Sequence, residues 1–418
     1  MRAPELYRRL FWPILAPSML LGIGNGAIIP VQVLAAMQLG ASGSLAALIV
    51  AIVGGIGLAT TMPAGRLIDR FGDQRAMLLA TTIVAVCTAV TIGALLWARE
   101  GALMLFMAAA FLRAPAMNIF SLARQAYTAE HVAPHEVGRA MTALGGTMRV
   151  GNLVGPLVGG LLLLALPLWS VYVLSILCAA LATMILFNPT RGELLDLPAD
   201  SPAALGSAQL DPSRKGRDAM PGVRWGAVFL AGIAMIALAV ARVAQPVVVQ
   251  LWGVHIGLSE SAISLVIAVG AAIEIVMMFP GGYLKDRLGR SVILVVCLAV
   301  YGTGFLLLVP FTHWAGTPGM VTAVVVMAIG NGLGAGVFMT VGADLSPTEG
   351  RGRFLGIWAL FSNVGILGGP LLISALVATA SVQAAVVAIG GIAVAGAVWT
   401  MVFATRIGLP KGIGRVRD

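Results

Sequence analysis

The chain has 418 residues, of which 59% are hydrophobic and only 10% are charged, and its net charge is +9. Soluble domains carry about 25% charged residues, so this composition excludes a soluble protein, whose surface so few charges cannot cover. The apolar content also excludes an intrinsically disordered chain. The composition therefore predicts a protein that crosses a membrane many times.

Taken in chain order, apolar segments recur at about the 20 residues that a spanning helix needs. A barrel strand needs only about 10 alternating residues, so the segments favour an all-α membrane protein. The first apolar run, from about Leu10 to Met37, is too long for a signal peptide. We therefore expect twelve transmembrane helices, over residues 11–37, 45–67, 76–98, 102–124, 139–165, 169–187, 223–251, 261–284, 291–311, 318–343, 354–377 and 381–405.

The segment 188–222 differs from its surroundings because five prolines lie among charged and small polar residues. We interpret it as a cytoplasmic linker between two six-helix bundles, residues 1–187 and 223–418. With the N-terminus inside, the cytoplasmic segments carry 22 of the 26 Lys and Arg residues, Arg124 and Lys285 among them, and the outer loops carry only Arg99. The positive-inside rule then places both termini in the cytoplasm. This asymmetry explains the net charge without a nucleic-acid partner.

Two sequence patterns occur once in each half of the chain. The segment 63–72 matches 280–289 at an offset of 217, and the segment 151–156 matches 365–370 at an offset of 214. The second offset also relates Glu130 to Asp344. Two halves with the same orientation predict a two-fold axis along the membrane normal, with a binding cavity between the halves near the midplane.

Each repeated pattern has a structural and a functional interpretation. The first loop, with glycines for close packing and a tight turn, is either a topogenic turn or a latch on the cytoplasmic side. The second pattern, Gly-x-x-x-Gly followed by proline, is either a packed kink or a gate, and the two roles are compatible. The residues that we expect to take part in conformational gating are Gly65, Asp69, Arg70, Gly72, Gly282, Asp286, Arg287, Gly289, Gly151, Gly155, Pro156, Gly369 and Pro370.

These patterns resemble a known family. Gly65-x-x-x-Asp69-Arg70-x-Gly72 resembles the signature loop of the major facilitator superfamily, although Asp73 and Gln74 follow where that loop usually has basic residues. The run from Gly151 to Gly160 resembles the fifth-helix motif of its proton-coupled exporters. The resemblance covers the whole chain and implies two six-helix bundles, alternating access, and export of a drug-like or metabolite solute against proton entry.

Two further likenesses are weaker. Arg113 matches the arginine of the fourth-helix exporter motif, but the Gln-Gly that normally follows is absent from this chain. The segment 118–124, together with Arg149 and Glu274, resembles bacterial sugar-efflux members of the superfamily. These likenesses leave the details of the proton relay and the solute open.

Four ionisable residues lie deep within the expected spans: Arg113, Arg149, Arg242 and Glu274. Each costs about 2.5–3.5 kcal/mol at a helix centre, so each is a functional candidate. Burial disfavours an ionised carboxylate and a nearby arginine favours it, so Glu274 is expected to couple solute movement to protons, with Arg242 and Arg113. The alternatives are a static pair of Glu274 with Arg242 and direct solute contact.

Uncharged polar residues complete the expected cavity. An asparagine within a span is more often a packing contact between helices than a ligand, but the glycines and Pro30 of the first span interrupt that helix, and Pro246 marks the corresponding place in the seventh. Interrupted helices in matching positions of the two halves indicate a binding site. The expected cavity residues, with Arg149, are Asn25, Gln32, Asn118, Asn152, Gln245, Asn331 and Asn363.

The sequence lacks patterns typical of enzymes and metal proteins. The four histidines have no metal-binding spacing, and no phosphate-binding Gly-x-x-x-x-Gly-Lys-Ser/Thr loop is present. The glycines of 330–336 are interpreted as a packing face within a continuous helix. We expect no cofactor and no metal, and a monomer of the bacterial inner membrane that works by proton antiport. The alternatives are a sugar or metabolite exporter, a proton symporter, and a receptor or scaffold that does not transport.

Overall fold

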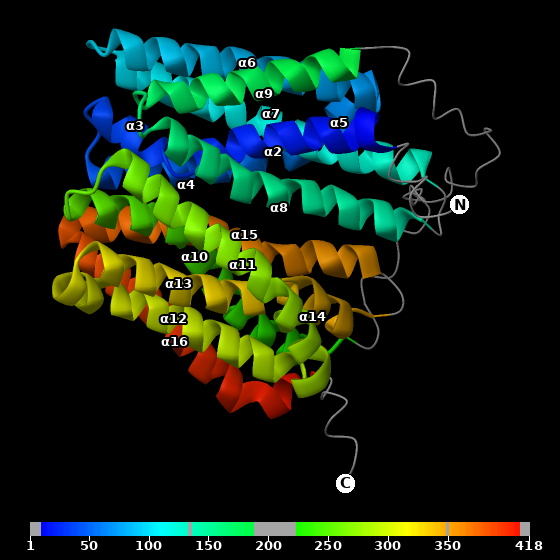
Figure 1. Cartoon of the computed structure of the whole chain (residues 1–418). Coiled ribbons are helices and arrows are strands. Elements are labelled where there is room, and N and C mark those ends of the chain that lie inside the picture. Colours follow the sequence, from blue (N-terminus) through cyan, green and yellow to red (C-terminus); the bar gives the residue numbers. More distant parts are fainter. Residues whose placement is uncertain (1–9, 133–135, 188–222, 348–350, 410–418) are drawn as a thin grey trace. The chain divides into compact units, whose positions relative to one another are not determined.

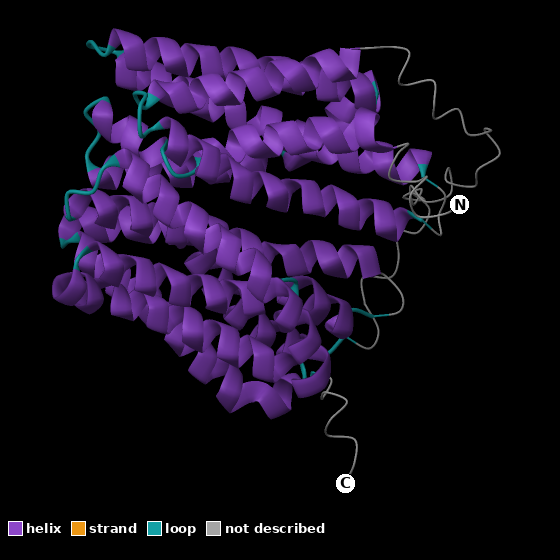
Figure 2. Cartoon of the chain, in the orientation of Figure 1, coloured by secondary structure: helices purple, strands orange, loops and turns teal. Residues whose placement is uncertain are grey.

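The computed structural model describes residues 10–132, 136–187, 223–347 and 351–409, and every regular element in these ranges is a helix (Figure 2). The chain divides into two compact units, one of Met1–Ala41 with Ile52–Gly216 and one of Ser42–Ala51 with Arg217–Asp418. The linker expected over 188–222 lies outside the described residues.

The first half of the chain forms the elements η1 to α9 (Figure 1). A short π-helical segment, η1, leads into α2, and a bend of 48° at Thr60 separates α4 from α5. The elements are η1 (Phe11–Leu15), α2 (Ala16–Ile28), α3 (Gln32–Gln38), α4 (Gly43–Ala59), α5 (Thr61–Phe71), α6 (Asp73–Trp97), α7 (Ala102–His131), α8 (Val137–Leu162) and α9 (Trp169–Phe187).

The second half forms the elements α10 to α16. Prolines lie inside α10, α11, α12 and α15 without ending these helices. The elements are α10 (Trp225–His255), α11 (Glu260–Leu288), α12 (Arg290–Ala315), α13 (Thr317–Leu333), α14 (Val337–Leu345), α15 (Arg351–Thr379) and α16 (Val382–Ile407).

The helices pair in the same way in the two units. In the first unit α2 packs against α8 and α9, α6 packs against α7 and α9, and α5 packs against α7. In the second unit α10 packs against α15 and α16, α12 packs against α13 and α16, and α11 packs against α13. The internal repeat read from the sequence is therefore a repeat of structure as well.

Ten helical segments of the described chain are long and apolar enough to cross a membrane, or eleven if the bent pair α4 and α5 is counted as one span. Each of the twelve expected segments coincides with one helix or with consecutive helices. The segment that falls short is α8, which has the length of a span but carries Arg139, Arg149 and seven glycines. The fold is that of an all-α, multi-pass membrane protein.

Small residues let α2 and α8 approach closely within the first unit. A methyl group added at Gly26 would lie 2.4 Å from the carbonyl oxygen of Gly151, and one added at Gly155 would lie 2.4 Å from the backbone nitrogen of Ala27. Only glycine fits at such distances. The same arrangement recurs in the second unit, where Gly369 packs against the backbone of α10. The Gly-x-x-x-Gly patterns are therefore packing faces within each unit.

The signature loops use their glycines differently from the sequence expectation. A methyl group at Gly65 or at Gly282 would meet no described atom within 4 Å, so neither position requires glycine for close packing. The close approach is made instead by Gly281, whose added methyl group would lie 2.8 Å from the Leu333 backbone. Gly72 and Gly289 do serve the turn, because their φ angles are 81° and 90°.

Two expectations about interrupted helices are wrong. The seventh span is not broken at Pro246, because α10 continues through it to His255. The glycines of 330–336 do pack closely, since a methyl group at Gly330 or Gly332 would lie 2.6 Å from the backbone of Tyr301 or Glu274. They do not lie in one continuous helix, because residues 334–336 separate α13 from α14. Gly336 has a φ of 76°, a conformation that costs other residues about 1–2 kcal/mol. The first span is interrupted as expected, between α2 and α3.

Candidate functional site

The second unit joins Glu274, Asn331 and Arg242 by hydrogen bonds. The Nδ2 of Asn331 donates to Oε2 of Glu274 at 2.8 Å, and the Nε of Arg242 donates to Oδ1 of Asn331 at 2.7 Å. α11 supplies the carboxylate, α13 the amide and α10 the guanidinium. Asn331 is only 7% exposed, so the amide that links the acid to the base is shielded from solvent.

This network lies beside the break in the tenth expected span. The Nη2 of Arg242 donates to the carbonyl oxygen of Gly334 at 2.9 Å, and the Nζ of Lys285 donates to the carbonyl oxygen of Ala335. A break in a spanning helix releases carbonyl groups that lipid cannot satisfy. Two cationic side chains satisfy them here, and one of the two also belongs to the Glu274 network.

Tyr301, which the sequence analysis did not single out, adjoins the same network. Its hydroxyl donates to Oε1 of Gln245 at 2.5 Å and lies 3.3 Å from the carbonyl oxygen of Ala241. Tyr301 is fully buried, and the charges of Glu274 and Arg242 act on its phenol. A tyrosine within an apolar run is normally a core residue, so only its position in space connects it to the site.

In the first unit, Arg113 links α7 to α2. Its Nη2 donates to Oδ1 of Asn25 at 3.1 Å, and Tyr172 on α9 and Cys87 on α6 lie within reach of its charge. The contact joins one expected coupling residue to one expected cavity residue. It also fixes Arg113 inside the helix packing of its own unit.

Asn118 makes contacts that hold helices together. Its Nδ2 donates to the carbonyl oxygen of Gly57 at 2.8 Å and to the hydroxyl of Thr61 at 3.2 Å. These acceptors lie on either side of the bend between α4 and α5. Asn118 therefore stabilises the bend.

The remaining expected cavity residues lie on three helices. Gln32 is on α3, Arg149 and Asn152 are on α8, and Asn363 is on α15. Asn152 is exposed and the other three are half-buried.

The expected gating residues of the two signature loops lie in the last turns of α5 and α11 or directly after them, and those of the glycine–proline patterns lie inside α8 and α15. Asp69 and Arg70 are exposed in the last turn of α5, and Arg287 lies over the ring of Tyr283 at 4.8 Å in α11. The side chain of Asp286 lies outside the described part of the chain.

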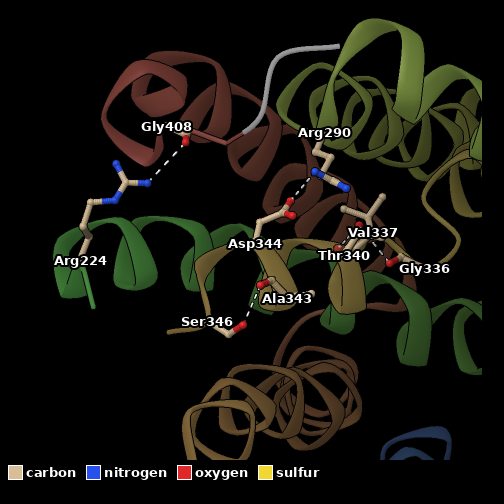
Figure 3. A network of polar contacts seen from close by, with 9 residues as sticks. All are labelled: Arg224, Arg290, Gly336, Val337, Thr340, Ala343, Asp344, Ser346 and Gly408. Atoms are coloured by element: carbon tan, nitrogen blue, oxygen red, sulfur yellow. Dashed lines mark hydrogen bonds and ion pairs between the residues drawn. The ribbon is translucent and has the colours of Figure 1, made fainter. Parts of the chain in front are cut away.

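The ion pair at this end of the second unit was missed from the sequence. The Nη1 of Arg290, the first residue of α12, lies 2.8 Å from Oδ2 of Asp344 on α14 (Figure 3). Arg224 donates to the carbonyl oxygens of Ile407 and Gly408 at 3.2 and 3.4 Å. The offset that relates Asp344 to Glu130 was the available signal for the ion pair, but nothing in it identifies the partner.

Arg124 and Lys285, which we expect from sequence in cytoplasmic segments, lie within long helices. Arg124 is seven residues before the end of α7 and is only 6% exposed. Lys285 lies in α11 and bonds the broken span, as described above. α7 and α11 therefore extend beyond their apolar runs, and the cytoplasmic location of both residues stays a prediction.

Comparison with known proteins places this fold in a family. The model of the Major Facilitator Superfamily matches residues 18–241 and 225–416. No protein of curated function matches the chain in sequence.

Solved structures of transporters share the fold. A POT family transporter in complex with a thioalcohol-conjugated peptide has a TM-score of 0.77 at 11% identity, over 97% of each chain. A D-xylose–proton symporter has a TM-score of 0.73 at 15% identity, over 98% of this chain and 99% of the other. The inward-open xylose transporter XylE from E. coli has a TM-score of 0.72 at 14% identity, over 98% of this chain and 97% of the other.

Identities this low demonstrate a common fold and carry no information on the solute. The family model, in contrast, matches the sequence along nearly its whole length. The chain is therefore a secondary transporter and belongs to the major facilitator superfamily.

Proposed function

We propose that this transporter exports a small organic solute by proton antiport, with Glu274 as the group that takes up and releases the proton. The solute is drug-like or a metabolite, and the protein works as a monomer in the bacterial inner membrane with both termini in the cytoplasm. The remaining expected cavity residues are candidates for solute contact.

The observation that carries this proposal is the hydrogen-bond chain from Glu274 through Asn331 to Arg242. A carboxylate accepts the Asn331 Nδ2–H in its ionised form, and protonation weakens that acceptor and releases a negative charge from beside a cation. Arg242 also holds the carbonyl of Gly334 at the helix break. Protonation of one acid is thus connected by two side chains to a discontinuous helix, the kind of element that moves during alternating access.

The direction of transport rests on a resemblance. The glycine–proline pattern of α8, which packs on α2, resembles the fifth-helix motif of proton-coupled exporters. The solved relatives, in contrast, include a D-xylose–proton symporter. Proton symport of a sugar or another metabolite is therefore the second candidate function. A receptor or scaffold has no need of Glu274 and Arg242 in a membrane span.

The test uses the purified protein in proteoliposomes that contain a pH-sensitive dye. Sugars, peptides and cationic dyes are added outside one at a time. An antiporter that carries the solute inward releases protons outward, so the interior becomes more alkaline. A symporter acidifies the interior. Acidification would overturn antiport and establish the second candidate.

Glu274→Gln tests the proton carrier, with Glu260→Gln, at the first position of the same helix, as the matched control. We expect Glu274→Gln to abolish the solute-driven pH change while solute exchange at equal pH on both sides continues. Glu260→Gln should behave as the wild type. A normal pH change with Glu274→Gln would remove this residue from the mechanism.

A further inference from the structure

Buried polar atoms that lack a hydrogen-bond partner are concentrated in the first unit. Among the described residues, all such side-chain atoms belong to this unit, and Arg124 is the only residue that contributes two of them. Protein interiors satisfy nearly all buried polar groups, so such atoms indicate a missing water or ion. The atoms are Ser18 Oγ, Asp73 Oδ2, Arg113 Nε, Arg124 Nε, Arg124 Nη1, Ser170 Oγ and Tyr172 Oη.

Among these residues Arg124 has the greatest need of a partner, because its positive charge is permanent. A guanidinium does not lose its proton in a protein, and Arg124 is 6% exposed. Its guanidinium carbon lies 5.9 Å from the centroid of the Phe120 ring, near the limit of a cation–π interaction. The hydroxyl of Thr128 bonds the backbone carbonyl of Arg124 and leaves the guanidinium unsatisfied.

No carboxylate in the described part of the chain acts on the charge of Arg124. Its neighbours along α7, Ala123 and Tyr127, belong to a buried hydrophobic cluster. An uncompensated buried charge is far more costly than a buried pair. A native structure that keeps Arg124 here therefore needs a counter-charge from outside these residues.

A second cation lies on the same face of α7. Arg113 precedes Arg124 by 11 residues, which is three helical turns plus about 20° and a rise of roughly 16 Å. No described carboxylate acts on Arg113 either, and its Nε lacks a partner. Two such cations make this face of α7 electropositive, which favours an anion over water alone as the missing partner.

We propose that Arg124 is an anion-binding residue, and that its guanidinium holds a small anion such as a halide, a phosphate or the carboxylate of a solute. The bound anion accepts hydrogen bonds from unpartnered N–H groups of the Arg124 guanidinium and neutralises its charge. The site is separate from the Glu274 network, and it does not depend on the direction of transport or on proton coupling.

The test measures the unfolding temperature of the purified full-length protein in detergent, with chloride replaced by gluconate at constant ionic strength. An anion that binds only the native state raises the unfolding temperature in proportion to the logarithm of its concentration once the site fills. We expect chloride to stabilise the wild type. We expect no chloride dependence in Arg124→Gln or Arg124→Met.

Arg139→Gln is the matched control, because it removes one positive charge from an exposed position of α8. It should keep the chloride dependence of the wild type. Arg124→Met should also be at least as stable as the wild type in gluconate, because it removes the uncompensated charge. If Arg124→Gln does not fold, Arg124→Met alone decides the test.

Transport distinguishes the two sources of the anion. If chloride competes with solute-driven proton movement in proteoliposomes, the site receives the solute, and if chloride has no effect or accelerates transport, the anion is resident. Both results support the site. A wild-type unfolding temperature that does not change with chloride, or an equal dependence in Arg124→Met, would overturn it.

Discussion

Arg290 and Asp344 form an ion pair of 2.8 Å that joins the start of α12 to α14 (Figure 3). The repeat offsets of 217 and 214 place Asp73 and Glu130 at the corresponding positions of the first unit. Arg290 of the second unit thus corresponds to Asp73 of the first. Asp344 corresponds to Glu130, which is also acidic.

The backbone around the two positions is nevertheless the same. Gly72, which precedes Asp73, has φ and ψ of 81° and 154°, and Gly289, which precedes Arg290, has 90° and 157°. The charges of Glu130 and Asp69 act on Asp73, and they have the same sign as its own. The turn is the same in both units, but the ion pair of the second unit corresponds to two acidic residues in the first.

Reversing the charge of Arg290 tests the ion pair. Arg290→Asp should lower the free energy of unfolding by about 1 kcal/mol, since both side chains are partly exposed and such pairs are screened by solvent. The double variant Arg290→Asp with Asp344→Arg should recover most of the loss. Chemical unfolding in mixed micelles measures both, and losses that simply add would show that the two residues do not interact.

Introducing the missing arginine into the first unit tests the repeat. Asp73→Arg places a cation near Glu130 and should raise the free energy of unfolding by about 0.5–1 kcal/mol. Asp73→Asn is the control, because it removes the repulsion without adding an attraction. An Asp73→Arg protein no more stable than Asp73→Asn would mean that the corresponding positions do not pair in the first unit.

The contact between α2 and α8 predicts a large effect of a single methyl group. In Gly151→Ala the new Cβ would lie 2.3 Å from the carbonyl carbon of Gly22, so the helices must separate, at a cost of about 1–3 kcal/mol. Gly145→Ala on the same helix meets nothing within 4 Å. It should be neutral or slightly stabilising, because alanine favours helix. Equal stability of the two variants would contradict the packing.

Removing the amide of Asn331 should destabilise the second unit. Asn331→Leu keeps the approximate volume but leaves Oε2 of Glu274 and Nε of Arg242 without this partner, and each buried unsatisfied group costs about 1–3 kcal/mol. We also expect loss of the solute-driven pH change in proteoliposomes. Asn363→Leu, at a half-buried position of α15, is the comparison for stability alone, because Asn363 is itself a candidate for solute contact. Normal transport by Asn331→Leu would show that Glu274 works without the bridge.

The conformation of Gly336 predicts a position-specific penalty. With a φ of 76°, Gly336→Ala should lower the free energy of unfolding by about 1–2 kcal/mol. Gly226→Ala, early in α10 and with open space around it, should have little effect. Thermal unfolding of the two variants measures the difference, and no difference would mean that the break between α13 and α14 adopts another backbone.

The apolar runs predicted the spans well, because lipid requires each backbone group to bond within its own helix. The ends were predicted less well, because α7 continues past Arg124 to His131. The break at 334–336 was missed because glycine serves both packing and turns. Glycine takes the turn conformation here because Arg242 and Lys285 donate hydrogen bonds to the backbone carbonyl groups that the break leaves without a helical partner.

The site was predicted in its residue types and not in its connections. Glu274, Arg242 and Asn331 each stand out as polar groups in apolar runs. That an asparagine on α13 bridges an acid on α11 and a base on α10 depends on helix rotation, which the sequence pattern does not set. Tyr301 was missed for the same reason.

The direct contact between the backbones of α2 and α8 affects how the first unit moves. No side chain lies between Gly26 and Gly151, so there are no rotamers there to switch between alternative packings. We expect the two helices to move together as one rigid body. Asn25 and Asn152, which adjoin Gly26 and Gly151, would therefore keep a constant distance from each other throughout the transport cycle.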